Sequence, residues 1–85
     1  MMDDQKVKID YPSQWNYKII IHTYAKIEKV VEDVVGDRTY TITKSHNSKN
    51  NTYISYKVTL LVHHEEDRVG LFHEFKKQNG VKIVL

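Results

Sequence analysis

Hydrophobic and polar residues alternate along the chain in four segments, which is the pattern of half-buried β-strands. These segments are Trp15 to His22, Arg38 to Ser45, Thr52 to Val62 and, more briefly, Val81 to Leu85. Each strand is expected to turn one set of side chains toward a core. On the second strand, Tyr40 and Ile42 point one way and Thr39, Thr41 and Thr43 the other. The predicted inward residues of the other strands are Trp15, Tyr17, Ile19 and Ile21 on the first, Ile54, Tyr56, Val58, Leu60 and Val62 on the third, and Val81, Ile83 and Leu85 on the last.

Two segments between these strands have the apolar spacing of amphipathic helices. The first predicted helix covers Tyr24 to Val35, with Thr23 as its N-cap and Gly36 after its last turn. The second covers Glu65 to Gln78, with acidic residues in its first turn and lysines in its last, as the helix dipole favours. Gly70 interrupts this helix, and we expect it to allow a close approach to the sheet. The predicted apolar faces are Ile27, Val30, Val31, Val34 and Val35, and then Val69, Leu71, Phe72 and Phe75.

The order of these elements predicts the fold. The short polar segment His46 to Asn51 joins the second and third strands and predicts a hairpin. Right-handed crossovers of the two β-α-β units place both helices on one face of the sheet. The sequence therefore predicts an α+β, ferredoxin-like βαββαβ domain with a four-stranded antiparallel sheet in the order 4-1-3-2. Residues 1–10 are predicted to be a flexible N-terminal segment, and residues 11–85 a single domain.

This arrangement leaves one sheet face without helices, and that face is the candidate contact surface. Alternation places Lys18, Lys57 and Lys82 there, close to one another and with no acidic residue to balance them. An anionic or mixed partner, such as a protein, a metabolite or RNA, would suit this face. A merely solvated face is the alternative, since antiparallel sheets commonly have one. The candidate contact residues are Lys18, Ile20, Tyr53, Lys57, Leu61, Lys82 and Val84.

The opening of the predicted domain, Tyr11-Pro12-Ser13-Gln14-Trp15-Asn16-Tyr17-Lys18-Ile19, resembles that of the YbeD-like family of small bacterial proteins of unknown function. The Ser48-Lys49 turn, the following Tyr53-Ile54-Ser55 and the aliphatic ending also match, so the resemblance covers roughly Ile9 to Leu85. It implies a ferredoxin-like domain related in shape to the ACT modules that regulate metabolic enzymes, and it implies no catalytic residues. Ser13 stands where many members have cysteine, so this chain cannot share any role of that cysteine.

Composition excludes several kinds of site. There is no cysteine, which excludes disulfides and cysteine-based zinc sites and predicts a cytoplasmic location. The longest aliphatic runs, Ile19-Ile20-Ile21 and Leu60-Leu61-Val62, are far shorter than the roughly 20 residues of a membrane span, so no membrane contact is expected. Thirteen basic and 11 acidic side chains give a net charge of +2. This charge is too small for a dedicated nucleic-acid binder.

The titratable residues form no recognisable catalytic or metal-binding pattern. His22 and His63 are predicted at opposite ends of the sheet, and the adjacent His63 and His64 would face opposite sides of a strand. The run Glu65 to Asp67 is explained by its position at a helix N-terminus. We therefore expect no enzyme activity, no metal ion and no cofactor.

The function expected from the sequence is that of a small, cytoplasmic regulatory or interaction module that binds a small molecule or a protein partner. Pairing of two copies, through a sheet edge or through the open face, remains an open alternative. RNA binding through the open face is the alternative function. It is disfavoured because Trp15 and Tyr17 are predicted to face the core, which leaves Tyr53 as the one ring outside. The sequence does not identify the ligand, the partner or the pathway.

Overall fold

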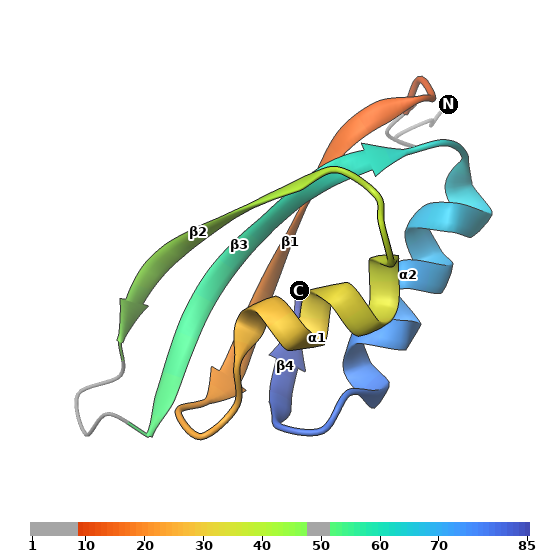
Figure 1. Cartoon of the computed structure of the whole chain (residues 1–85). Helices are drawn as coiled ribbons and strands as arrows, with labels where there is room; N and C mark the ends of the chain where they lie inside the picture. Colours follow the sequence, from red (N-terminus) through yellow and green to blue (C-terminus); the bar gives the residue numbers. More distant parts are fainter. Residues whose placement is uncertain (1–8, 48–51) are drawn as a thin grey trace, which may run out of the picture.

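The computed structural model describes residues 9–47 and 52–85. Most of the predicted flexible segment, residues 1–10, and most of the predicted hairpin connection lie outside the described residues. The observed order of elements is the predicted one, and the sheet order β2-β3-β1-β4 is the predicted succession with every pairing antiparallel (Figure 1). The elements are β1 (Ser13–His22), α1 (Ile27–Val35), β2 (Tyr40–Asn47), β3 (Tyr53–Val62), α2 (Glu65–Lys77) and β4 (Val81–Val84).

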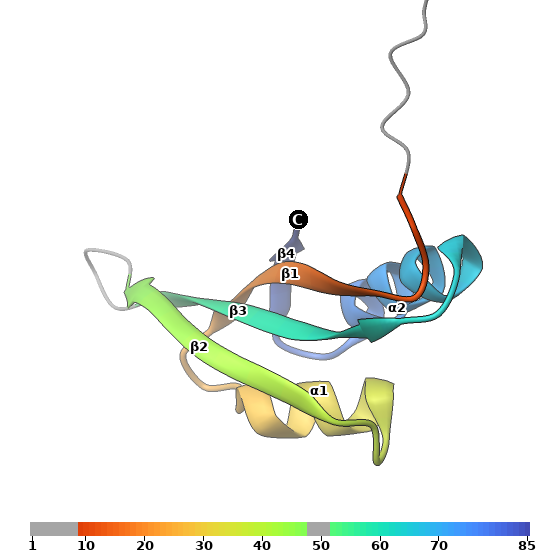
Figure 2. The same ribbon diagram turned by 90° about the horizontal axis from the view of Figure 1, so that it is seen from above.

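One hydrophobic core lies between the helices and one face of the sheet. Figure 2 shows how strongly the sheet twists between β2 and β4, with α1 on the side of β2. The predicted inward residues of β1, and those of β3 from Tyr56 to Val62, lie in or against this core, because the β1–β3 register runs without a shift. Ile54, also predicted inward, is only half-buried and is not part of the core. The most deeply buried side chains are Tyr17, Ile19, Ile21, Val31, Val58, Leu60, Val62 and Phe75.

The predicted alternation is wrong for β4. Val84 is opposite Ile19 and buried in the core, whereas Ile83 is opposite Ile20 and 42% exposed. Val81 also faces inward, opposite Ile21, because the β1–β4 register shifts between Ile20 and Ile21. Such an irregularity adds a residue to one strand and so breaks the two-residue period. Val84 therefore does not belong to the open face, and Ile83 takes its place there.

The start of α1 also differs from the prediction. The helix begins at Ile27, and its N-cap is Lys26, whose side chain makes no capping hydrogen bond. Thr23 is not the cap because its backbone N–H donates to the carbonyl of Thr52, 3.0 Å away, which holds it in a turn at the end of the sheet. Gly36 ends the helix as predicted, with a left-handed φ of 66° that favours glycine.

The prediction that Gly70 allows close packing is wrong. A Cβ at Gly70 would meet no heavy atom within 4 Å, so this glycine is not required by packing. The close approach is at Gly80, where a Cβ would lie 2.6 Å from the Cβ of Ala25 and where φ is 90°. Val69, predicted on the apolar face of α2, is 36% exposed, and the helix packs mainly through Leu71 and Phe75.

Candidate functional site: the open face of the sheet

A pair of lysines occupies the centre of the open face. Lys18 on β1 is directly opposite Lys57 on β3, and both side chains are exposed. Within residues 9–47 and 52–85, no carboxylate occupies an outward position of the four strands. Like charges directly opposite one another destabilise a sheet. The face therefore carries a cationic pair whose charge the sheet does not neutralise.

Apolar and hydroxyl side chains lie beside this pair. Ile20 is flanked by Ile83 on β4 and by Ser55 on β3. Ser55 is 5% exposed, and among the described residues its hydroxyl has no hydrogen-bond partner. On the other side of the lysines, the Thr59 hydroxyl donates to the Asn16 side-chain oxygen at 2.6 Å. The surface is thus a mixed one, with apolar area next to positive charge.

Aromatic rings gather at one end of the face. The His22 ring stacks on the Tyr24 ring, with centroids 5.1 Å apart, and meets the Tyr53 ring at 4.9 Å. The Lys82 ammonium lies 5.6 Å from the centre of the Tyr53 ring, within the range of a cation–π contact. Lys82 therefore lies at this end of the face. The His22–Tyr53 pair that marks this end is two outward positions along the strands from the Lys18–Lys57 pair.

The predicted contact residues therefore lie in different parts of the structure. Lys18 and Lys57 come together, Ile20 lies beside them, and Tyr53 and Lys82 form the ring-rich end. Leu61 is at the opposite end, 38% exposed and opposite Gln14. Val84 belongs to the core. His22, Tyr24 and Ile83 were not among the predicted residues, although the outward position of His22 on β1 follows from the alternation.

Arg38 and Asp67 form an ion pair on the helix side of the sheet that the sequence did not reveal. The Arg38 guanidinium donates to both carboxylate oxygens of Asp67, at 2.7 and 3.1 Å. This hydrogen bonding by Arg38 holds the pKa of Asp67 below its usual value. Asp67 also accepts the backbone N–H of His63, and its own N–H donates to the His64 ring at the N-cap of α2. The acidic start of α2 therefore has a structural role.

Further polar contacts tie β1 and the residue Tyr11 before it to α2. The Tyr17 hydroxyl donates to the carbonyl of Arg68 at 2.6 Å, and burial raises the pKa of Tyr17 to about 12. The Arg68 Nε donates to the Tyr11 hydroxyl at 2.9 Å, and its guanidinium lies 4.7 Å from the centre of the Trp15 ring. The hydrogen bond to Tyr11 raises the pKa of Arg68.

The described part of the chain contains no cluster of three or more histidine and acidic side chains placed to hold a metal ion. Among the same residues, no helix is both long and apolar enough to span a bilayer.

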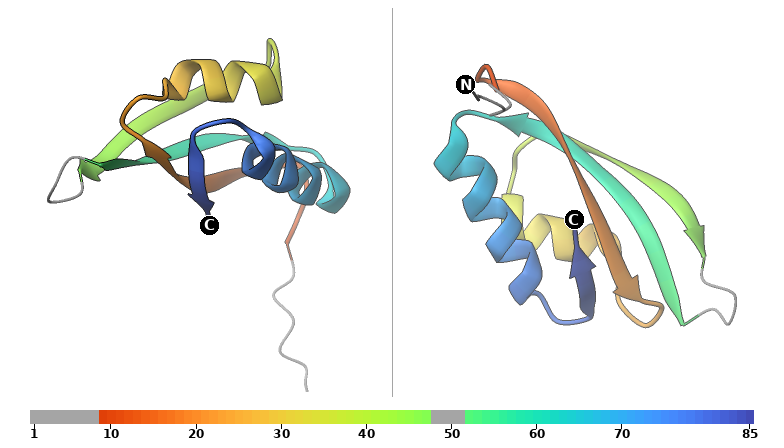
Figure 3. Two further views of the ribbon diagram at one scale, coloured as in Figure 1. Left: turned by 90° about the horizontal axis from the view of Figure 1, so that it is seen from below. Right: turned by 180° about the vertical axis from the view of Figure 1, so that it is seen from behind.

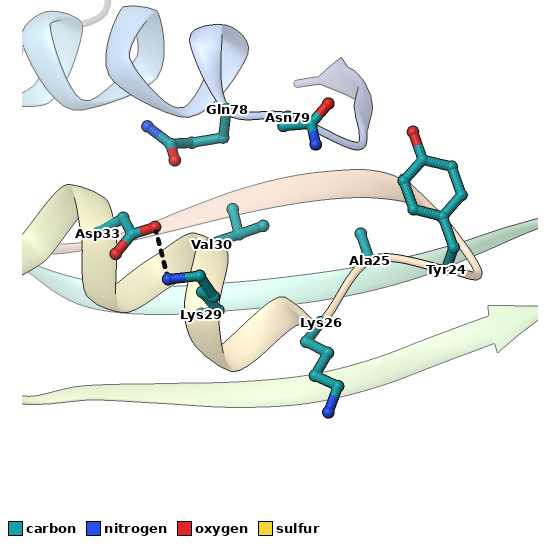
Figure 4. Close-up of a pocket in the computed structure, with 8 residues that line it drawn as sticks. All are labelled: Tyr24, Ala25, Lys26, Lys29, Val30, Asp33, Gln78 and Asn79. Carbon is teal, nitrogen blue, oxygen red and sulfur yellow. Dashed lines mark ion pairs between the residues drawn. The ribbon is translucent and has the colours of Figure 1, made fainter.

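A cavity of about 310 Å³ lies between α1 and the connection from α2 to β4 (Figure 4). Figure 4 shows Lys26 pointing away from Gln78 and Asn79, while Lys29 forms an ion pair with Asp33 at 3.5 Å. The charged groups of the cavity therefore face away from it or pair with each other, unlike Lys18 and Lys57. The full lining is Tyr24, Ala25, Lys26, Lys29, Val30, Asp33, Gln78 and Asn79.

Comparison with known proteins places this architecture among uncharacterised bacterial relatives. The family described as "Protein of unknown function (DUF493)" matches residues 6–85. The uncharacterized protein Cj0253 of Campylobacter jejuni is 32% identical over 78 residues, which are 92% of this chain and 87% of that protein.

Two solution structures of the protein HP0495 from Helicobacter pylori have the same fold at 26% sequence identity. One aligns with a TM-score of 0.83 and covers 98% of this chain and 91% of that chain. The other, described as a hypothetical protein, aligns with a TM-score of 0.67 and covers 98% and 96%. None of these relatives is described by an activity, a ligand or a partner.

Proposed function

Since this chain belongs to the DUF493 family of proteins of unknown function, we propose its function from its surface: it is a non-catalytic interaction module that docks an acidic segment of a partner protein. The observation that carries this proposal is the Lys18–Lys57 pair, placed directly opposite across β1 and β3 with no carboxylate among the described outward residues. The partner is inferred from charge complementarity.

The energetics of the lysine pair support this proposal. A like-charge pair directly opposite in an antiparallel sheet is destabilising, where an opposite-charge pair would contribute roughly 0.2–1 kcal/mol. A face that only needed to be solvated could carry both signs and avoid this penalty. A carboxylate of a partner that lies between Lys18 and Lys57 interacts favourably with both ammonium groups. Binding would therefore relieve a repulsion that the free protein retains.

Binding, not catalysis, also fits the location of the perturbed titratable groups. The residues with shifted pKa values are Tyr17, Arg38, Asp67 and Arg68, and all four take part in the contacts that join α2 to the rest of the domain. Their shifts follow from burial and from the hydrogen bonds of this structural network. Catalytic sites usually combine such shifts with a cleft. Tyr17 and Arg68 do line a cavity, but the Tyr17 hydroxyl donates to the Arg68 carbonyl and the Arg68 Nε donates to Tyr11, so both groups are engaged within the domain. These shifts support a role in stability.

Two finer assignments remain proposals. The opening Tyr11 to Ile19 supports a YbeD-like member of the family, and the absence of cysteine supports a cytoplasmic location. A regulatory role with a small-molecule ligand is a second candidate, favoured by the cavity of about 310 Å³ beside α1, which is at the lower end of the size of ligand sites.

RNA binding is the alternative function for the same surface. The ring cluster of His22, Tyr24 and Tyr53 favours it, because bases stack on exposed rings. The net charge of +2 and the position of the rings at one end of the face favour a protein partner instead.

The test measures binding of two fluorescent probes at low salt by anisotropy: a short glutamate-rich peptide and a short oligouridine. The double variant Lys18→Glu/Lys57→Glu should bind the peptide about tenfold more weakly. The control Lys26→Glu/Lys29→Glu makes the same change of net charge on α1 and should bind nearly as wild type. Equal losses in both variants would contradict the proposal, and tighter binding of oligouridine than of the peptide would replace it with RNA binding.

A further inference from the structure

Strand β4 is too short to cover the whole edge of β1. It pairs with β1 from Ile19 to Ile21, and Leu85 then exchanges two backbone hydrogen bonds with Lys18, at 2.8 and 3.1 Å. The first half of β1 extends beyond that point (Figure 3). Along this half, no described residue pairs with β1 on the side that faces α2, so β1 is an edge strand there within the described residues.

The backbone groups on this edge can be identified from the ladder. In an antiparallel sheet, the N–H and C=O of one residue point to the same side, and the side alternates along the strand. Lys18 points to β4, so Asn16 and Gln14 point to the same edge. For their backbone groups, the described residues supply no hydrogen-bond partner there. An edge of this kind is a template for another strand.

A cavity of about 360 Å³ lies next to the free edge, between β1 and α2. Its lining includes Arg68, which is held by Tyr11 and stacked on Trp15. No acidic side chain is among its lining residues. These are Trp15, Tyr17, Arg68, Val69, Phe72, His73 and Leu85.

We infer that this edge takes an extended segment of the partner protein as an added strand, antiparallel to β1 and in line with β4, in which acidic and apolar side chains alternate. The inference rests on the proposed function, since it names how the acidic partner is held. Strand addition supplies main-chain hydrogen bonds for affinity and pockets for alternate side chains for specificity.

The register of β1 fixes which side chain goes where. A segment residue opposite Trp15 points to the helix side, as Trp15 does, and enters the cavity beside Val69 and Phe72. The residues opposite Asn16 and Gln14 point to the open face, and the one opposite Asn16 lies diagonally beside Lys18. Apolar side chains therefore suit the inward positions and carboxylates the outward ones.

Both sides of the edge complement such a segment. The outward side carries Lys18 and, one strand further, Lys57, without an acidic neighbour among the described outward positions. The inward side is largely apolar and includes the cationic Arg68. A proline-rich segment would not suit this edge because proline has no N–H to donate to the free carbonyls.

The test compares two peptides of identical composition, one in which Glu and Val alternate and one in which the glutamates and valines form separate blocks. Binding to the full chain, labelled with nitrogen-15, is followed by amide chemical shifts and by hydrogen exchange. The alternating peptide should bind about tenfold more tightly and should slow the exchange of the Gln14 and Asn16 amides.

Three variants locate the site. Val69→Trp keeps the charge and fills the cavity from an exposed helix position, and it should weaken binding of the alternating peptide about tenfold. Val69→Ala leaves the cavity open and should bind as wild type. As a second probe of the edge, Asn16→Pro removes one free N–H without removing a ladder hydrogen bond, and it should also weaken binding.

Equal affinity for the two peptides, or retention of full affinity by Val69→Trp, would overturn strand addition. The proposed function would survive that result if Lys18→Glu/Lys57→Glu still lost the binding. Failure of both peptides to bind at low salt would overturn the two together.

Discussion

The two faces of the sheet are built from the same strands but differ in how completely their polar groups are neutralised. On the helix side, the Tyr17 hydroxyl has an acceptor, and the Arg38 and Asp67 charges neutralise each other at 2.7 Å. On the open side, Lys18 faces Lys57, and the Ser55 hydroxyl has no partner in the described part of the chain. These polar groups of the covered face have partners within the domain, whereas Lys18, Lys57 and Ser55 on the open face have none among the described residues.

This difference separates residues that stabilise the fold from residues that are available for binding. A buried polar group without a partner destabilises a protein, so native structures pair nearly all of them. The covered face follows this rule through contacts between distant segments. On the open face, the buried Ser55 hydroxyl departs from it among the described residues. Beside it, the exposed Lys18 and Lys57 are directly opposite each other, and that is why we place the contact with a partner there.

The largest expected effect is a difference in stability between the two faces. Phe75→Ala removes a fully buried ring that packs 5.3 Å from the Tyr17 ring, and it should lower the free energy of unfolding by about 3–5 kcal/mol. Leu61→Ala on the open face, where Leu61 is 38% exposed, should lower it by less than about 1 kcal/mol. Urea titration of both variants checks this, and similar losses would show that the open face is part of the core.

A smaller effect is expected at the ion pair of the covered face. Asp67→Asn removes the charge paired with Arg38, and it should lower the free energy of unfolding at neutral pH by about 1–3 kcal/mol. The pKa of Asp67 is lowered in the folded protein, so its contribution is present above the ordinary carboxyl pKa of about 4 and is lost as the pH falls through the folded value.

The difference between wild type and Asp67→Asn should therefore shrink as the pH falls below about 4. Urea titrations of both proteins at a series of pH values measure this. Arg38→Gln serves as the matched control because it breaks the same pair from the other side. A difference that stays constant down to the lowest pH would exclude the ion pair as its source.

The order of elements and the topology of the sheet were predictable because each depends on local periodicity and on the handedness of the crossovers. The inward residues of β1, and those of β3 from Tyr56 to Val62, follow for the same reason. The β4 prediction failed because a register shift within the sheet displaced the alternation, and no local pattern reveals such a shift. The N-cap prediction for Thr23 was wrong because a tertiary hydrogen bond holds this residue in a turn. The packing prediction for Gly70 was wrong because no other element lies close to this position of the helix.

The candidate site was predictable in part. Alternation alone places Lys18 and Lys57 on the open face, and antiparallel pairing brings them opposite each other. The ring cluster depends on Tyr24, which lies in a turn and has no strand periodicity. The free edge of β1 depends on where β4 ends relative to β1, a long-range property. The Arg38–Asp67 pair joins residues 29 positions apart and leaves no trace in local sequence.

The most direct measurement of the central claim applies two readouts to one variant, Lys57→Glu. This substitution turns the like-charge pair with Lys18 into an opposite-charge pair, so the free energy of unfolding at low salt should rise by about 0.2–1 kcal/mol. The same variant should bind the glutamate-rich peptide more weakly than wild type. Greater stability together with weaker binding is the predicted result, and unchanged peptide affinity would contradict the claim that this lysine pair is kept for a partner.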